Sequence, residues 1–497
     1  MTELFAHTNS SKDTMTWRAD STAIEAASER PVATIEVAPS QALAKNVLFI
    51  SYAFLPSIEM GARTCSQIAR YLPLYGWKPV VLTIDESSIE KRYIKQNPAG
   101  SVEEEFDFVI RTKPLPHAFD FYRWIRSAFS KTFEQPPTEA TTNATDKNES
   151  HSGKKSGIRL WLLSLLSIPD MYTGWLIPAL WAGLRGIRRT KAEAIFSSGP
   201  YWTNHLIAYC LMRLTGLPWV VHYRDPWISG YTQVSFRSGL EFRIGSWLER
   251  MTVERSGSVV CVTEEHCEML RSAYPGVPAD KFVAIPNGYD GAEWKELDKQ
   301  IASETQSQSD KFVITYAGKL YINRSPMPVF RALRTLIDRG EIAPDRVRID
   351  LIGWCENSEG KSVSDLITET GLEGCVNLVG LLKHGETLQR LAQSDLLLLL
   401  AESLTLQIPG KTFEYLKSGR PTLALTSDGA VANLIRKTCG GWAIDPTDDE
   451  GVIRVIRQCY RDWSDGKAPL SPDPKIVASY DRRFTTAKLG ELLDNLT

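Results

Sequence analysis

The sequence lacks the signatures of several common protein classes. Its eight cysteines are scattered over 497 residues, without a Cys-x-x-Cys pair or a cysteine–histidine cluster at zinc spacing. Neither Gly-x-Gly-x-x-Gly nor Gly-x-x-x-x-Gly-Lys-Ser/Thr occurs, which disfavours ordinary NAD and P-loop ATP chemistry. The Gly-x-Ser-x-Gly pattern of a nucleophilic serine is absent as well. We therefore expect reduced cytosolic thiols and none of these three chemistries.

The sequence also lacks a strong charge of one sign and a long apolar run. Its formal net charge is -2, so no basic field suggests a nucleic-acid partner. The N-terminus has no basic start followed by an apolar run, so we expect no signal peptide and a cytoplasmic protein. The most apolar region, 160–184, is interrupted by Pro169 and Pro178, and its uninterrupted runs are too short to span a bilayer.

This apolar region has two interpretations. Arg159 precedes it, and several basic residues between Arg185 and Lys191 follow it. One interpretation is a pair of core helices. The other is a peripheral contact of residues 159–191 with the anionic inner face of the cytoplasmic membrane, and three indoles would then lie near the lipid headgroups: Trp161, Trp175 and Trp181. The sequence leaves both open.

The order of the chain indicates two α/β domains. Short apolar runs of strand type alternate with helical patterns over 45–295 and again over 311–477. Runs that are apolar throughout predict parallel sheets buried on both faces, so each half is expected to be Rossmann-like. The expected strands are 46–51, 79–83, 194–198, 219–223, 258–263, 282–285, 312–317, 347–352, 376–379, 396–401 and 422–425.

Four other segments are assigned by composition. Residues 1–44 are polar and without lasting periodicity, which predicts a disordered tail. Residues 131–157 are rich in Thr, Asn, Ser and Pro, which predicts a flexible insertion. Residues 296–310 are a polar linker between the domains, and residues 478–497 end in an amphipathic helix.

The strongest local motif is Pro-Gly-Lys-Thr-Phe-Glu-Tyr-Leu, which starts at Pro409 and follows a very apolar strand. A helix is expected to begin near Lys411, and its free N–H groups suit a diphosphate. Lys411 adds a positive charge there. Glu414 lies on the same helix face, where a carboxylate can accept hydrogen bonds from two adjacent ribose hydroxyls. The alternative is an ordinary surface helix with a Glu–Lys pair.

A second motif follows the first strand of the second domain. Ligands in open α/β sheets bind beyond the C-terminal ends of strands. Gly318 permits close approach of the backbone, and Lys319 and Arg324 place two cations on one short loop. These cations can neutralise a departing nucleotide diphosphate, although two solvated charges on a loop are the simpler interpretation.

The first domain offers candidates for binding an acceptor. Arg224 and Asp225 follow a buried strand, where Asp225 can bind or deprotonate an acceptor hydroxyl, or the pair can instead fix its own loop. Gly61 begins a helix that is expected to point into a cleft, two residues before Arg63. His205 follows the turn at 197–200 and either faces the cleft or serves the structure.

Together these motifs resemble the family 4-like retaining glycosyltransferases, and most closely the branch that acts in bacterial surface-polysaccharide synthesis. The resemblance covers about residues 46–496. It is carried by seven segments in order: the Gly61 loop, 74–83, Ser-Ser-Gly-Pro at 197–200, Arg-Asp-Pro-Trp at 224–227, 285–290, 316–321 and the helix at 409–416.

The resemblance implies a GT-B fold, in which two Rossmann-like domains face a central cleft and the last helix crosses back to the first domain. It implies that Lys319 and Arg324 hold the diphosphate of a UDP- or GDP-sugar and that Glu414 binds the ribose. The backbone at Pro409, Gly410 and Thr412 would touch the sugar or phosphate, and the base would lie near Leu381 and Leu382. It also implies transfer with retention to a glycan or lipid-linked acceptor, without a cofactor or a metal, which agrees with the absence of an Asp-x-Asp motif.

The sequence departs from the family pattern at one position and leaves two other functions open. Leu406 stands where family members often carry a glutamate that contacts the donor sugar, while Glu402 is out of register. A sugar-nucleotide 2-epimerase on the same fold would convert the donor without an acceptor. A non-catalytic scaffold would bind the nucleotide sugar without turnover.

Overall fold

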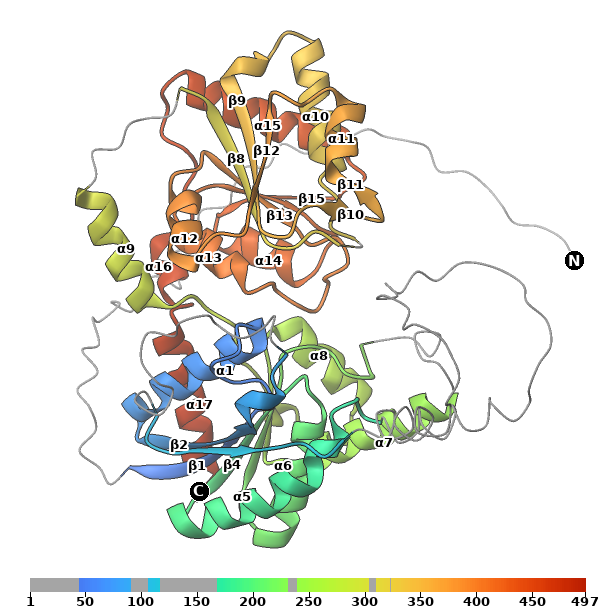
Figure 1. Ribbon diagram of the computed structural model, residues 1–497, viewed down its shortest axis with the longest axis vertical. Helices are drawn as coiled ribbons and strands as arrows, with labels where there is room; N and C mark the ends of the chain where they lie inside the picture. The colour runs from blue at the N-terminus through green and yellow to red at the C-terminus, as the bar shows by residue number, and fades with distance from the viewer. Residues whose placement is uncertain (1–43, 91–105, 117–167, 231–238, 304–309, 322) are drawn as a thin grey trace, which may run out of the picture. The chain divides into compact units, whose positions relative to one another are not determined.

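The computed structural model describes residues 44–90, 106–116, 168–230, 239–303, 310–321 and 323–497. The insertion expected at 131–157, and all of the tail expected at 1–44 except its last residue, lie outside these ranges. The described chain contains two parallel sheets with helices on both faces (Figure 1).

The N-terminal domain is built on a seven-stranded parallel sheet. In spatial order its strands are β3 (Val109–Thr112), β2 (Trp77–Ile84), β1 (Lys45–Ile50), β4 (Ala194–Gly199), β5 (Trp219–Tyr223), β6 (Ser258–Cys261) and β7 (Phe282–Ala284). The direction of winding reverses between β1 and β4, which is the topological switch point where such sheets bind ligands.

Helices cover both faces of this sheet because its strands are apolar on both sides. Val47 and Phe49 of β1 pack into one core with α1 (Met60–Tyr71) and α17 (Arg482–Leu496). Leu48 and Ile50 pack into the other core, with α5 (Leu176–Thr190), α6 (Thr203–Thr215), α7 (Gly239–Arg255) and α8 (Glu264–Ala273).

The C-terminal domain repeats this plan on a six-stranded parallel sheet. Its strands are β12 (Val376–Gly380), β9 (Val347–Ile352), β8 (Phe312–Ala317), β13 (Leu396–Leu400), β14 (Thr422–Leu425) and β15 (Gly441–Ile444). All five residues of β13 are buried leucines, each stabilising the fold by about 1.5–3 kcal/mol. A short antiparallel pair, β10 (Asn357–Ser358) and β11 (Lys361–Ser362), lies outside this sheet.

The helices of this domain also form two layers. One core includes residues of α10 (Met327–Asp338), α11 (Val363–Thr370) and α15 (Asp449–Ser464). The other includes residues of α9 (Gly291–Ser303), α12 (His384–Ala392), α13 (Lys411–Lys417), α14 (Ala430–Lys437) and α16 (Pro474–Ala478). The segment expected as a linker at 296–310 is therefore helical in its first half, where α9 continues to Ser303.

The last helix, α17, packs on the N-terminal domain beside α1, and Figure 1 shows it in red against the blue first elements. Its Leu489 and Leu493 belong to the core of the first sheet. The indole nitrogen of Trp77 donates a 3.1 Å hydrogen bond to Asp494. The first described strand and the last helix thus belong to the same domain.

The apolar region at 160–184 is only partly described, and what is described is a core helix with one exposed face. The buried residues of α5 include Ala179, Gly183 and Gly186, whereas Ile177 and Trp181 are 67% and 65% exposed. Trp175 is fully buried and its indole donates to Thr112, so the expectation that it lies near lipid headgroups is wrong. Within the ranges given above, no helix is both long and apolar enough to cross a bilayer.

Candidate active site

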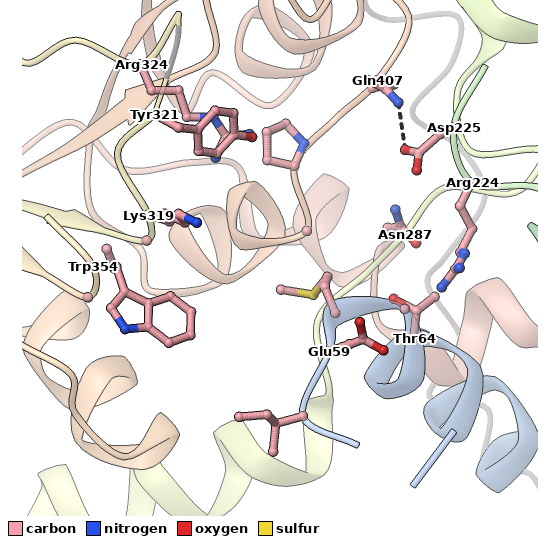
Figure 2. Close-up of a pocket in the computed structure, with 18 of the residues that line it drawn as sticks. Glu59, Thr64, Arg224, Asp225, Asn287, Lys319, Tyr321, Arg324, Trp354 and Gln407 are labelled. Atoms are coloured by element: carbon pink, nitrogen blue, oxygen red, sulfur yellow. Dashed lines mark hydrogen bonds between the residues drawn. The ribbon is translucent and has the colours of Figure 1, made fainter. Parts of the chain in front are cut away.

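A cavity of about 850 Å³ lies where loops at the C-terminal ends of strands from both sheets meet. Figure 2 shows Lys319, Tyr321, Arg324 and Trp354 on one side of it, and Glu59, Arg224, Asp225 and Asn287 on the other. Ten of the expected site residues line it: Gly61, Arg224, Asp225, Gly318, Lys319, Arg324, Leu381, Leu382, Pro409 and Gly410. Five others lie elsewhere: Arg63, His205, Lys411, Thr412 and Glu414.

The two expected cations stand on the loop that follows β8. The guanidinium of Arg324 lies over the ring of Tyr321, 4.3 Å from its centroid, which orients the side chain. Among the described residues, neither Lys319 nor Arg324 pairs with a carboxylate, so their positive charge is available to an anion in the cavity. The backbone at Gly318 has φ +146°, a conformation that favours glycine.

Lys411 lies beneath this loop instead of facing the cavity. Its ammonium group donates a 2.9 Å hydrogen bond to the carbonyl of Ala317 and lies 3.9 Å from the ring centroid of Tyr316. Burial, with the nearby charge of Arg324, holds the pKa of Lys411 well below its usual value. Lys411 therefore supports the loop from below and is not placed to contact a diphosphate directly.

The residues just before α13 reach the cavity, whereas those of its first turn do not. Pro409 and Gly410 line the cavity, whereas the side chain of Thr412 is fully buried. The hydroxyl of Thr412 has no hydrogen-bond partner within the described part of the chain. The role expected at 409–412 thus rests on Pro409 and Gly410, because Thr412 points into the core.

Glu414 belongs to a cluster of charges that links α1, α9, α12 and α13. Its carboxylate lies 3.6 Å from both Arg63 and His384. Arg63 also lies 2.7 Å from Glu293, and His384 lies 3.2 Å from Glu293. Burial raises the pKa of Glu293, but the hydrogen bond from His384 and the charge of Arg63 leave it below the ordinary value. Arg63 thus pairs with the C-terminal domain and does not face the acceptor side of the cavity, contrary to expectation.

On the N-terminal side, Gly61 and Arg224 are fitted to each other. The guanidinium of Arg224 donates a 3.1 Å hydrogen bond to the carbonyl of Gly199 and a second bond to that of Pro200. A Cβ atom at position 61 would lie 2.5 Å from the Nη1 of Arg224. A side chain at position 61, the second residue of α1, would therefore displace the guanidinium from its place in the cavity wall.

Asp225 connects the two domains across the cavity. Its carboxylate accepts a 2.6 Å hydrogen bond from the side-chain amide of Gln407, drawn as a dashed line in Figure 2. Burial raises the pKa of Asp225, while Arg224 and Gln407 oppose the rise. A carboxyl with a raised pKa holds or takes up a proton more readily, which suits it to contact a hydroxyl group.

His205 is not an acceptor-binding residue, and this expectation is corrected. Its side chain is fully buried among Trp202, Trp219 and Tyr223, and its Nδ1 lies 2.9 Å from the hydroxyl of Ser197. Burial, helped by the charge of Arg224, lowers the pKa of His205 to about 3. The histidine faces the core because the helix α6 turns its first residues inward.

The lining residues that were not selected from the sequence include five with polar or aromatic side chains: Glu59, Asn287, Tyr321, Trp354 and Gln407. Tyr321 and Trp354 are each 46% exposed, which is unusual for large aromatic side chains and suits contact with a ligand. Their signal in the sequence was position, because both stand on loops directly after strands. Gln407 follows Leu406, which does not line the cavity. The carbonyl of Leu406 accepts a 2.6 Å hydrogen bond from the hydroxyl of Thr263.

Comparison with known proteins gives one family match. Residues 61–288 match the family described as "Glycosyl transferase 4-like domain". No curated protein matches the chain in sequence. The match covers most of the N-terminal domain, including the Gly61, Arg224 and Asp225 positions.

Solved structures extend the likeness to nearly all of the chain. Alr3699/HepE of Anabaena, in complex with UDP, is 16% identical with a TM-score of 0.55, and the match covers 91% of this chain and 100% of that one. The same protein has been solved with UDP-glucose. Sucrose-phosphate synthase of Thermosynechococcus elongatus is 14% identical with a TM-score of 0.52, covering 91% of this chain and 94% of that one.

A third structure with a similar fold comes from a protein named as a phosphatase. The N-terminal domain of trehalose-6-phosphate phosphatase of Candida albicans is 13% identical with a TM-score of 0.58, covering 92% of this chain and 98% of that one. At such identities the likeness concerns the fold alone. The predicted fold class is confirmed: the chain has a GT-B fold with two parallel-sheet α/β domains, and residues 61–288 are similar to the 4-like glycosyl transferase family.

Proposed function

We propose that this chain transfers a sugar from a nucleotide-diphosphate sugar to a glycan or lipid-linked acceptor in cell-surface polysaccharide synthesis. The observation that carries the proposal is the placement of Lys319 and Arg324 in a cavity lined by both domains. UDP is the first nucleotide to test, since HepE, which shares the fold, has been solved with UDP-glucose.

The chemistry follows from charge. When the bond between the sugar and the diphosphate breaks, negative charge grows on the leaving phosphate oxygen. Two preorganised cations stabilise that charge more in the transition state than in the bound donor, and such effects are usually a large part of catalysis. Lys319 and Arg324 fill this role without requiring a metal ion or other cofactor.

The acceptor side is proposed to lie on the N-terminal wall. Arg224 and Asp225 border the cavity there, and Asp225 is held by Gln407 from the other domain. In a transfer with retention the donor phosphate itself can take the acceptor proton, so no protein nucleophile is required. Asp225 then orients the acceptor hydroxyl through a hydrogen bond.

The test of this proposal compares UDP with uridine. Calorimetry on the purified protein should show that UDP binds. Lys319→Ala and Arg324→Ala should lower the affinity for UDP but leave the affinity for uridine nearly unchanged, because both cations act on the diphosphate. Lys361→Ala is the matched control, since Lys361 pairs with Glu369 away from the cavity. Equal UDP affinity in the parent and both cavity variants would show that the site is misassigned.

Two assays separate transfer from the alternatives. Incubation with a UDP-sugar and no acceptor should not yield an epimeric donor, whereas a 2-epimerase would produce one. Incubation with a panel of donors and glycan acceptors should release UDP, whereas a non-catalytic scaffold would bind donors without turnover.

We also propose a peripheral contact between α5 and an anionic membrane surface. The exposed face of this helix carries Ile177 and Trp181, and Arg185 stacks on Trp181 with 5.0 Å between the guanidinium carbon and the ring centroid. An apolar patch with basic neighbours suits anionic lipid. Sedimentation with phosphatidylglycerol vesicles should fall in Trp181→Ser and not in Leu470→Ser, an exposed leucine of the C-terminal domain. Absence of salt-sensitive binding by the parent would remove this part of the proposal.

A further inference from the structure

A second cavity, of about 510 Å³, lies beside the candidate active site, and we call it the side pocket. It shares Pro200, Asp225 and Gln407 with the first cavity, so the hydrogen-bonded pair of Asp225 and Gln407 stands in their common wall. Its volume lies in the range of about 300–1,000 Å³ that is usual for small-molecule sites. A ligand in the side pocket would lie next to the sugar of a donor bound in the first cavity.

The walls of the side pocket combine polar groups with two indole rings and other apolar side chains. Trp202 and Trp227 stack with ring centroids 4.8 Å apart and an interplanar angle of 5°. Pro169, Pro226 and Ile228 line the remaining apolar wall. Trp227 is 4% exposed and covers one face of Trp202, so the half-buried Trp202 is the indole that can meet a ligand. The electron-rich face of an indole attracts the weakly positive C–H groups on one side of a pyranose ring, so Trp202 suits a sugar.

Buried carboxylates hold these walls in place. Glu249 is 1% exposed and accepts 3.0 Å hydrogen bonds from the backbone N–H groups of Ile228 and Ser229. Asp170 accepts a 2.9 Å bond from the N–H of Thr203, the residue after Trp202. Because both tryptophans sit beside backbone that is fixed by such bonds, the pocket is formed before a ligand arrives.

The polar groups of the side pocket favour a neutral ligand over a phosphate. Its described lining includes the carboxylate of Asp225 and the amide of Gln407, and no lysine or arginine is among these described residues. A phosphate there would lose its water without gaining a cation from them, which is costly. Sugar hydroxyls instead donate to the carboxylate of Asp225 and accept from the amide of Gln407, as each group requires.

We propose that the side pocket binds the terminal sugar ring of a neutral glycan acceptor and presents one hydroxyl to the donor past Asp225 and Gln407. The inference rests on the proposed function and narrows it: the acceptor is a neutral glycan end, not a lipid phosphate. Trp202 is the specificity-determining residue, because it forms the platform for the ring.

The test uses saturation-transfer NMR with two kinds of probe at saturating UDP. One is a mixture of the methyl glycosides of glucose, galactose, mannose and N-acetylglucosamine; the other is farnesyl phosphate. At least one glycoside should receive saturation from the parent protein. Trp202→Ala should weaken its affinity about three- to tenfold, and Trp202→Phe, which keeps an aromatic face, should restore most of it. Trp247→Ala, which removes an exposed tryptophan of α7 outside the pocket, should leave the affinity unchanged.

Several results would overturn the inference. Binding of UDP with no saturation of any glycoside would do so, as would glycoside signals that survive Trp202→Ala. Binding of farnesyl phosphate in place of the glycosides would assign the pocket to a lipid phosphate, and this comparison on the parent protein does not depend on the folding of any variant. Failure of the parent to bind UDP would instead count against the proposed function, so the two failures are distinguishable.

Discussion

The two walls of the cavity differ in the charge that they present. The C-terminal wall offers Lys319 and Arg324 on one loop, with the exposed rings of Tyr321 and Trp354 beside them. The N-terminal wall offers the carboxylates of Glu59 and Asp225, and Arg224 beside them donates hydrogen bonds to two backbone carbonyls. A cavity divided in this way can hold an anion on one side and hydroxyl groups on the other, which is the need of a sugar transfer.

The two domains also differ in the burial of their histidine side chains. The N-terminal domain buries His205, His222 and His266, whereas His384 of the C-terminal domain is 34% exposed and lies among carboxylates. Burial lowers the pKa of each of the three, to about 3 for His205 and about 4 for His266. Because of this difference, acid should lower the stability of the N-terminal domain more than that of the C-terminal domain.

The largest expected effect is therefore a loss of stability of the N-terminal domain in mild acid. The fold keeps the three imidazoles neutral while the unfolded chain protonates them below about pH 6.5, so stability is full above that pH and falls as the pH drops. At about pH 5.5 the loss is about 1.4 kcal/mol for each histidine, or about 4 kcal/mol in total. Hydrogen exchange, corrected for intrinsic rates, should show it in β4 and β5 more than in β8 and β13.

His384→Gln provides the control for this experiment, since its imidazole is partly exposed and should not change the acid sensitivity of β4 and β5. Equal protection of β4 and β5 at neutral pH and at about pH 5.5 would contradict the assignment of neutral buried imidazoles.

The next largest effect should come from Arg324→Ala on the cationic wall. Removing one preorganised donor from a developing oxyanion typically lowers turnover about 10²- to 10³-fold. Release of UDP from UDP-glucose should fall by that factor, while the thermal midpoint stays near that of the parent because Arg324 is not part of the core. A fall of less than about threefold would mean that the charge on this wall does not act on the leaving group.

A smaller effect is expected from Glu414→Gln, which tests whether the cluster with Arg63 and His384 serves the ribose. A carboxylate that accepts a ribose hydroxyl contributes about tenfold or more to affinity. The variant should lower the affinity for UDP by about that factor and reduce the preference for UDP over 2′-deoxy-UDP. If both nucleotides weaken equally, Glu414 only holds the domains together.

The smallest expected effect is that of metal removal. Two side-chain cations are proposed to neutralise the diphosphate, so transfer measured after dialysis against EDTA should equal transfer in added magnesium or manganese within error. A loss of activity that these ions restore would mean that a bound metal, and not Lys319 and Arg324, neutralises the diphosphate.

Most of the fold could be predicted because its strands are apolar on both faces. Runs such as the five leucines of β13 stand out in any sequence and predict buried parallel strands. Apart from the short pair β10 and β11, the strands that escaped prediction are β3 and β15, which have four residues each and no fully buried one. Their apolar signal is too short and too weak, and only pairing with β2 and β14 makes them strands.

A site residue could be predicted where its position after a strand decides whether it lines the cavity. It could not be predicted where the direction of its side chain decides this. Lys319, Arg324, Arg224 and Asp225 follow strands directly, and the C-terminal edge of a parallel sheet is where ligands bind. The directions of His205 and Lys411 depend on packing inside one domain, and that of Arg63 depends on partners more than two hundred residues away. No local pattern encodes such partners, and the contact between Asp225 and Gln407 escaped prediction for the same reason.

The return of α17 to the first domain has a consequence for how the protein is made. Leu489 and Leu493 complete the core that contains Val47 and Phe49, so this core needs segments more than four hundred residues apart in the sequence. The second sheet takes all its strands from one stretch of sequence, between β8 and β15, which ends before α17 begins. During synthesis the second sheet is therefore able to close before the core around Val47 and Phe49 is complete.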